Sequence, residues 1–146
     1  MEMVAERKIN RITRSLQSKY RGEINTGNVI QELTQHGYDT VFFNTAKGDR
    51  LLKAYGLTSG NEKAFTYCGA TKVVFVDGNL HNIDKLYVLL HELGHIVLCH
   101  IGTDSTKYQN VIQAEVEADA FVYAVMNPPK LNKIQILLSV VTLLAV

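Results

Sequence analysis

The sequence predicts an α+β domain, and three observations carry this prediction. Residues 4–20 and 25–35 place apolar side chains at helical spacing, and residues 82–100 and 111–126 do so again in the C-terminal half. Between these two groups lie short runs of β-branched and aromatic residues bounded by turn residues. Such an order indicates helices packed on a small antiparallel or mixed sheet.

The composition bounds the class of protein. With 146 residues, 47% apolar and 20% charged, the chain is long enough for one domain with a buried core, which we expect over residues 1–146. A net charge of +1 favours neither nucleic acid nor an anionic membrane, so direct nucleic-acid binding is not expected. Cys68 and Cys99 form no CxxC pair and lie in apolar runs, which predicts reduced, buried thiols. Such thiols, with a charged N-terminus that resembles no signal peptide, indicate a cytoplasmic protein.

The first helix has an apolar stripe and a basic face. Ile9, Ile12 and Leu16 form the stripe, and five basic residues lie mostly opposite. We interpret the basic face as solvated, because no aromatic residues alternate with the charges as a base-stacking surface would require. The next expected elements are a helix over residues 25–35 ended by Gly37, a strand over 38–43, a short helix over 51–55, and a hairpin of strands 64–68 and 72–76 around Gly69-Ala70-Thr71.

The stretch LLHELGHIVLCH, residues 89–100, contains the pattern HExxH. Asn82 or Asp84 is expected to cap its helix. His91 and His95 lie four residues apart and so share one helix face, where two imidazoles can bind one metal ion. Glu92 is offset around the helix, in a position to take a proton from water instead of binding the metal. Gly94 lacks a side chain, which allows another backbone segment to approach closely.

The alternative is an apolar core helix with incidental polar residues. Leucine, isoleucine and valine surround the three polar groups, so much of the helix is expected to be buried. Three unpaired polar groups would then each cost about 1–3 kcal/mol, which a shared ion removes. We therefore favour a metal site. A catalytic zinc site needs three protein ligands and one open position, so a third ligand is expected elsewhere in the chain.

The candidates for this third ligand lie in residues 113–126, QAEVEADAFVYAVM. Glu115 and Asp119 are four residues apart and share a face of the expected helix. Glu115 could complete the site, and Asp119 could accept the free N–H of a ligating imidazole and fix its tautomer. Glu117 is the rival ligand, but it points about 200° away from Glu115, so the two cannot face one ion. A solvated acidic turn is the remaining alternative.

The other histidines and the cysteines are weaker candidates. His100 lies past the face shared by the HExxH histidines and is interpreted as a helix-end histidine or a donor on the substrate side. His36 and His81 are expected to be ordinary surface or loop residues. A structural site with four protein ligands, joined by His100 or Cys99, is an alternative to a catalytic one. Tyr108, Tyr123 and His100 are candidates for oxyanion support.

HELGHIVLCH followed by EVEADAFVYAVMNP resembles the ImmA/IrrE-type metallopeptidases, which pair an HE(L/I)GH helix with a downstream ExEA(N/D)xFAxxLLMP helix. The resemblance covers about residues 64–128. It implies a zincin-like metallopeptidase fold, Zn²⁺ as cofactor, and hydrolysis of a peptide bond in a protein substrate. His91 and His95 match the family's ligand positions and Glu92 its catalytic position.

A related pattern bears on the third ligand. Glu115 with Asp119 matches the ExxxD pattern of glutamate-liganded zincins, which favours Glu115 over Glu117. The sequence departs from the family where Val122 and Tyr123 replace small residues and where Asn127 interrupts the usual ending.

The resemblance also implies a partner. Members of this family are often encoded on prophages and mobile elements, where they cut a helix-turn-helix repressor, so a DNA-binding repressor is the expected substrate. The strand over residues 72–76 is expected to offer an edge with which an extended substrate pairs. A rival hypothesis is a metal-stabilised regulatory or binding module of the same fold with little or no peptidase activity. Another is a soluble fragment that resembles membrane-embedded HELGH proteases.

Residues 130–146 form an apolar C-terminal segment. Its last part, residues 134–146, is almost wholly apolar but shorter than the roughly 20 residues that a membrane-spanning helix needs. We expect a buried terminal helix. The alternatives are a tail that contacts a membrane and the start of a longer chain.

Overall fold

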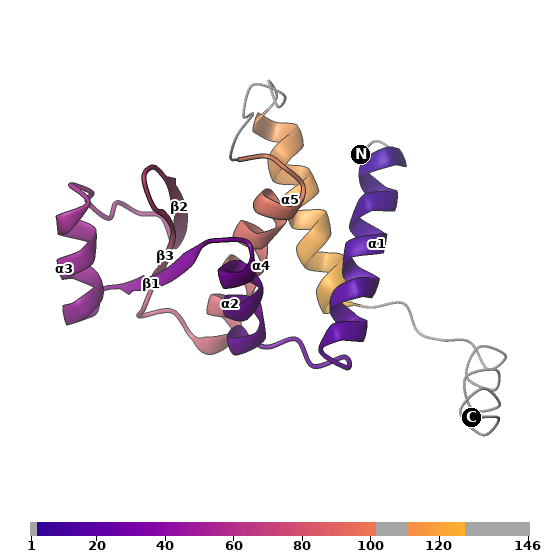
Figure 1. Ribbon diagram of the computed structural model, residues 1–146, viewed down its shortest axis with the longest axis horizontal. Coiled ribbons are helices and arrows are strands. Elements are labelled where there is room, and N and C mark those ends of the chain that lie inside the picture. The colour runs from indigo at the N-terminus through magenta and orange to yellow at the C-terminus, as the bar shows by residue number, and fades with distance from the viewer. Residues whose placement is uncertain (1–2, 102–110, 128–146) are drawn as a thin grey trace, which may run out of the picture.

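The computed structural model describes residues 3–101 and 111–127, and this part of the chain has the expected α+β fold (Figure 1). Five helices and a three-stranded sheet are present in these two ranges. In chain order the elements are α1 (Met3–Lys19), α2 (Thr26–Gln35), β1 (Asp39–Phe43), α3 (Ala46–Ala54), β2 (Ala64–Cys68), β3 (Lys72–Asp77), α4 (Asn82–Val97) and α5 (Val111–Met126).

The sheet is mixed, with the strand order β1-β3-β2. The central strand β3 pairs parallel with β1, with Val73 opposite Asp39, and antiparallel with β2, with Phe75 opposite Phe65. The predicted hairpin is therefore confirmed. The prediction that the strand over residues 72–76 offers an edge is wrong, because both of its sides are paired. Among the described strands, β2 lies at an edge of the sheet with one side unpaired, and it also contacts α4.

The sheet separates two apolar cores, because successive side chains of β3 point to opposite faces. Val74 and Val76 face the larger core, which is built with α1, α2, α4 and α5 and includes the predicted stripe residues of α1. Val73 and Phe75 face a smaller core that α3 covers. Figure 1 shows α3 on one side of the sheet and the other four helices on the opposite side. The larger core thus fixes α4 and α5, which carry the candidate site residues.

The helices α2 and α3 end in the Schellman motif, in which a residue of left-handed conformation follows the helix. Gly37 (φ 86°) and Gly56 (φ 70°) take this conformation after α2 and α3. In the first case the amide of Tyr38 donates to the carbonyl of Leu33 at 2.9 Å. Glycine has no Cβ, so this conformation carries no steric cost. The predicted end of the second helix at Gly37 is confirmed.

Two helix starts differ from the predictions. α3 begins at Ala46 instead of residue 51, because the Thr45 hydroxyl accepts a hydrogen bond from the amide of Gly48 at 3.0 Å and caps the helix. The N-cap of α4 is His81, whose side chain makes no capping hydrogen bond, so the prediction that Asn82 or Asp84 caps this helix is wrong.

The predicted burial of the two cysteines is also wrong. Both thiols are free, as expected, but both are exposed. Cys68 is the last residue of the edge strand β2, and Cys99 lies in the turn after α4. The predictions for Tyr108 and for residues 130–146 concern positions outside the described residues. Over residues 3–101 and 111–127, no helix combines the length and apolar character that crossing a bilayer requires.

Candidate metal centre

The two helices α4 and α5 approach each other closely at Gly94. A Cβ atom built at Gly94 would lie 3.0 Å from Cδ1 of Phe121 and 3.4 Å from Cα of Ala118. The residues around this contact are buried, with Ala118 and Phe121 fully enclosed. The predicted role of Gly94 in allowing close approach is confirmed. This close approach places the turns of α5 that carry Ala118 and Phe121 against the HExxH turns of α4.

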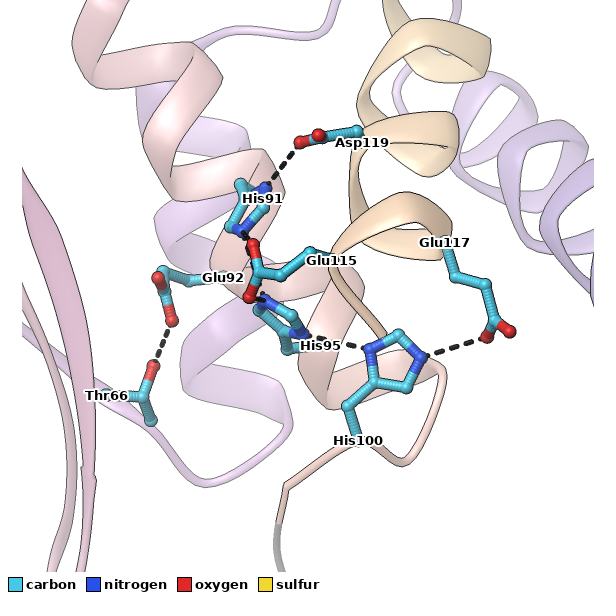
Figure 2. Close-up of polar contacts among 8 residues, drawn as sticks. All are labelled: Thr66, His91, Glu92, His95, His100, Glu115, Glu117 and Asp119. Atoms are coloured by element: carbon cyan, nitrogen blue, oxygen red, sulfur yellow. Dashed lines mark hydrogen bonds and ion pairs between the residues drawn. The ribbon is translucent and has the colours of Figure 1, made fainter. Parts of the chain in front are cut away.

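The close approach brings three potential metal ligands together, here called the His-His-Glu site (His91, His95 and Glu115). The two Nε2 atoms of the histidines lie 3.0 Å apart. The Glu115 carboxylate spans them, with Oε2 at 2.9 Å from Nε2 of His91 and Oε1 at 3.0 Å from Nε2 of His95 (Figure 2). All three donor atoms lie within 4.8 Å of one another, so a single ion can contact all three.

The donor set of the His-His-Glu site fits a divalent transition metal. Two imidazole nitrogens and one carboxylate oxygen form a ligand set that zinc uses in catalytic sites. Donor atoms bound at 2.0–2.1 Å in a tetrahedral arrangement lie about 3.3 Å apart, close to the separations found here. Burial, followed by the charge of His91, lowers the pKa of His95, which favours the neutral ring that a metal requires.

Asp119 lies one turn after Glu115 on α5 and contacts the other side of the His91 ring. Its Oδ1 atom is 3.0 Å from Nδ1 of His91, so the two ring nitrogens of His91 face two different carboxylates. A metal ion bound at Nε2 of His91 would leave the proton of the ring on Nδ1, which would then donate it to Asp119. The structure thus places Asp119 where the four-residue spacing predicts it.

Glu92 lies beside the His-His-Glu site without joining it. Figure 2 shows its carboxylate next to that of Glu115, and Oε2 accepts a hydrogen bond from the hydroxyl of Thr66 on β2 at 2.5 Å. Burial raises the pKa of Glu92, against the opposing effects of the Thr66 hydrogen bond and of His91. A partly buried carboxyl of raised pKa next to potential metal ligands is suited to accept and release a proton. The role of Thr66 as a hydrogen-bond donor to Glu92 cannot be predicted from the sequence, because it depends on the pairing of β2.

Glu117 points away from the His-His-Glu site, as its angular offset from Glu115 predicts. Its carboxylate is buried against His100, with Oε1 at 3.0 Å from Nε2 of that ring. His100 lies beyond the end of α4 and is itself buried, which rules out the predicted role as a donor on the substrate side. Cys99 is exposed near Lys8 and is no member of the site. Among the described residues, neither His100 nor Cys99 joins the three ligands, so the four-ligand structural site is not supported.

The remaining predicted candidates are placed more simply. His36 and His81 are exposed, as expected. Tyr123, a candidate for oxyanion support, projects into solvent from α5, with 71% of its surface exposed.

The contact at Gly94 provides a first testable prediction. Because a branched side chain would push α5 away from α4, we expect Gly94→Val to lower the free energy of unfolding by about 1–3 kcal/mol. We also expect it to weaken metal binding by separating Glu115 from the histidines. Thermal unfolding of the metal-free protein and a zinc titration measure the two effects.

A matched control exists in α2. A Cβ at Gly27 meets only Oδ1 of Asn25, at an ordinary 3.4 Å, so Gly27→Val is expected to change the free energy of unfolding by about 0.5 kcal/mol or less. Equal stability and equal zinc affinity of Gly94→Val and Gly27→Val would show that the helix contact does not build the site.

Comparison with protein-family models matches residues 34–131 to Peptidase_M78, described as the IrrE N-terminal-like domain. No curated protein and no solved structure matches the chain. The matched residues extend from the end of α2 past α5 and include the His-His-Glu site, Glu92 and Asp119. The family match therefore covers more than half of the chain together with its candidate site. This chain belongs to the Peptidase_M78 family, the ImmA/IrrE type of metallopeptidase.

Proposed function

We propose that this protein is a zinc-dependent endopeptidase that hydrolyses a peptide bond in a protein substrate, namely a helix-turn-helix repressor. The observation that carries the proposal is the convergence of His91, His95 and Glu115 on one point, with the Glu92 carboxylate beside them. The membership in a metallopeptidase family supports the reaction class.

In the proposed reaction, Nε2 of His91, Nε2 of His95 and the Glu115 carboxylate would hold the zinc ion. When bound, zinc supplies Lewis acidity, which makes water a nucleophile near neutral pH and polarises a carbonyl. Glu92 takes a proton from the attacking water and passes it to the leaving amine. Thr66 orients Glu92 by donating to Oε2, which leaves Oε1 for the proton.

The edge strand β2 is the proposed place for the substrate backbone. Thr66 is its central residue and touches Glu92, so β2 runs past the catalytic carboxylate. In the described part of the chain β2 pairs only with β3. An extended peptide can pair with the other side as an added strand, which would hold the scissile bond against the His-His-Glu site.

The test uses a helix-turn-helix repressor from the same genome as the substrate. The zinc-loaded protein is incubated with the purified repressor, and the products are identified by mass spectrometry. The proposal expects one or a few defined cleavages, which disappear with a chelator and return when zinc is restored. An intact repressor in the presence of zinc-loaded protein would reject this substrate. Absence of zinc binding would reject the proposed reaction class.

A further inference from the structure

The turn after α4 folds the chain back onto the His-His-Glu site. Cys99 has φ 62°, its amide donates to the carbonyl of Ile96 at 3.1 Å, and the amide of His100 donates to the carbonyl of His95 at 2.8 Å. This is the same Schellman motif that ends α2 and α3, but a residue with a side chain stands where those helices have glycine. The left-handed conformation costs such a residue about 1–2 kcal/mol, a cost that contacts of the neighbouring side chains can offset.

Those contacts include a buried chain of polar side chains. Nδ1 of His95 lies 2.9 Å from Nδ1 of His100, and Nε2 of His100 lies 3.0 Å from Oε1 of Glu117 (Figure 2). The second oxygen of Glu117 accepts a hydrogen bond from Gln113 at 2.8 Å. Only 1% of the His100 side chain and 4% of the Glu117 side chain are exposed. This series of hydrogen-bonded side chains therefore runs through the protein interior from α5 to the Nδ1 side of the His95 ring.

The donors and acceptors in this series of hydrogen bonds follow from the two facing Nδ1 atoms of His95 and His100, because only one of the two can carry the shared hydrogen. A ring that offers the Nε2 lone pair to a metal must carry its proton on Nδ1. His95 Nδ1 then donates to His100 Nδ1. A neutral His100 therefore carries its proton on Nε2 and donates it to the Glu117 carboxylate. The reverse direction would place a proton on Nε2 of His95, where it would block the metal.

We infer that His100 and Glu117 are positioning residues, which together hold the His95 ring in the tautomer and orientation that bind the metal. The inference rests on the proposed function, because it assumes that His95 is a metal ligand. It gives each histidine of the site an acidic anchor on its Nδ1 side: Asp119 directly for His91, and Glu117 through His100 for His95. The two anchors differ in environment, because the Asp119 side chain is 74% exposed and that of Glu117 is buried.

This difference predicts unequal effects on metal binding. His100→Phe keeps a ring but removes the acceptor for His95, so we expect its zinc affinity to fall about 10–100-fold. Asp119→Asn is expected to cause a smaller loss, because water can replace an exposed partner. Cys99→Gly is the control for the turn itself, because glycine adopts the same conformation, and its zinc affinity is expected to equal that of the wild type. Affinities are measured on the full chain by chelator competition, and thermal unfolding of the metal-free variants checks that each one folds.

A second measurement does not depend on any variant. Two-bond ¹⁵N–¹H correlation spectra of the histidine-labelled, zinc-loaded wild type report which ring nitrogen of His100 carries the proton. The inference requires protonation on Nε2 alone, and a proton on Nδ1 would overturn it. A folded His100→Phe variant whose zinc affinity falls less than tenfold would also overturn it, and if that variant does not fold, the spectra decide alone. A wild type that binds no zinc would refute the proposed function, whereas these other outcomes refute the inference alone.

Discussion

Replacement of Glu92 by glutamine is expected to lower the rate of peptide hydrolysis about 10²–10⁴-fold while zinc content stays at the wild-type level. Glutamine has nearly the same shape and can still accept the hydrogen bond from Thr66. It cannot accept a proton from water. Because burial raises the pKa of Glu92, ionising this carboxyl costs folding free energy, so the neutral variant is not expected to be less stable than the wild type.

The measurement is the turnover of a cleaved repressor, combined with metal analysis of the same samples. Glu23→Gln, at an exposed position before α2, is a matched control that is expected to keep full turnover. Turnover of Glu92→Gln within tenfold of the wild type, at equal zinc content, would remove Glu92 from the mechanism. A Glu92→Gln protein that still performs the cellular function would favour the rival hypothesis of a metal-stabilised binding module.

Replacement of Glu115 by glutamine is expected to have the largest effect on metal binding, with zinc affinity reduced by more than about 100-fold. The Glu115 carboxylate spans both histidines, so this change removes the charged ligand that faces them. Zinc at 100 times its dissociation constant stabilises a protein by about 2.7 kcal/mol, so the wild type is expected to unfold at a higher temperature with zinc than without it. Glu115→Gln is expected to lose most of this difference.

Asp119→Asn provides the comparison for Glu115→Gln. Asp119 contacts Nδ1 of His91, the ring nitrogen that faces away from the His-His-Glu site, so its loss leaves the three donor atoms in place and is expected to weaken zinc binding less. Calorimetric titration with zinc measures both variants under identical conditions. Equal affinities of Glu115→Gln and the wild type would show that the third ligand is not Glu115.

Much of the His-His-Glu site follows from helical spacing. Residues four apart share a helix face, which is why the sequence predicts that His91 pairs with His95 and Glu115 with Asp119. The angular offset also separates Glu117 from Glu115, and the structure shows the two carboxylates on different partners. These are local properties of single helices, so they can be predicted without knowledge of the fold.

What the sequence does not reveal depends on contacts between distant segments or on unusual backbone. The turn at Cys99 has a left-handed residue that is not glycine, so no sequence signal indicates that α4 ends at Val97 and that His100 folds back. The parallel pairing of β1 with β3 leaves β2 as the edge strand beside α4. The sequences of β1 and β3 do not indicate that these two strands pair with each other. The link from Thr66 to Glu92 follows from that pairing.

Anomalous diffraction at the zinc absorption edge, from crystals of the zinc-loaded wild type, tests the central claim most directly. The account predicts one anomalous peak at about 2.0–2.2 Å from Nε2 of His91, Nε2 of His95 and a carboxylate oxygen of Glu115, with no fourth protein ligand. A peak elsewhere, or a fourth protein side chain on the ion, would contradict a catalytic metal centre between α4 and α5.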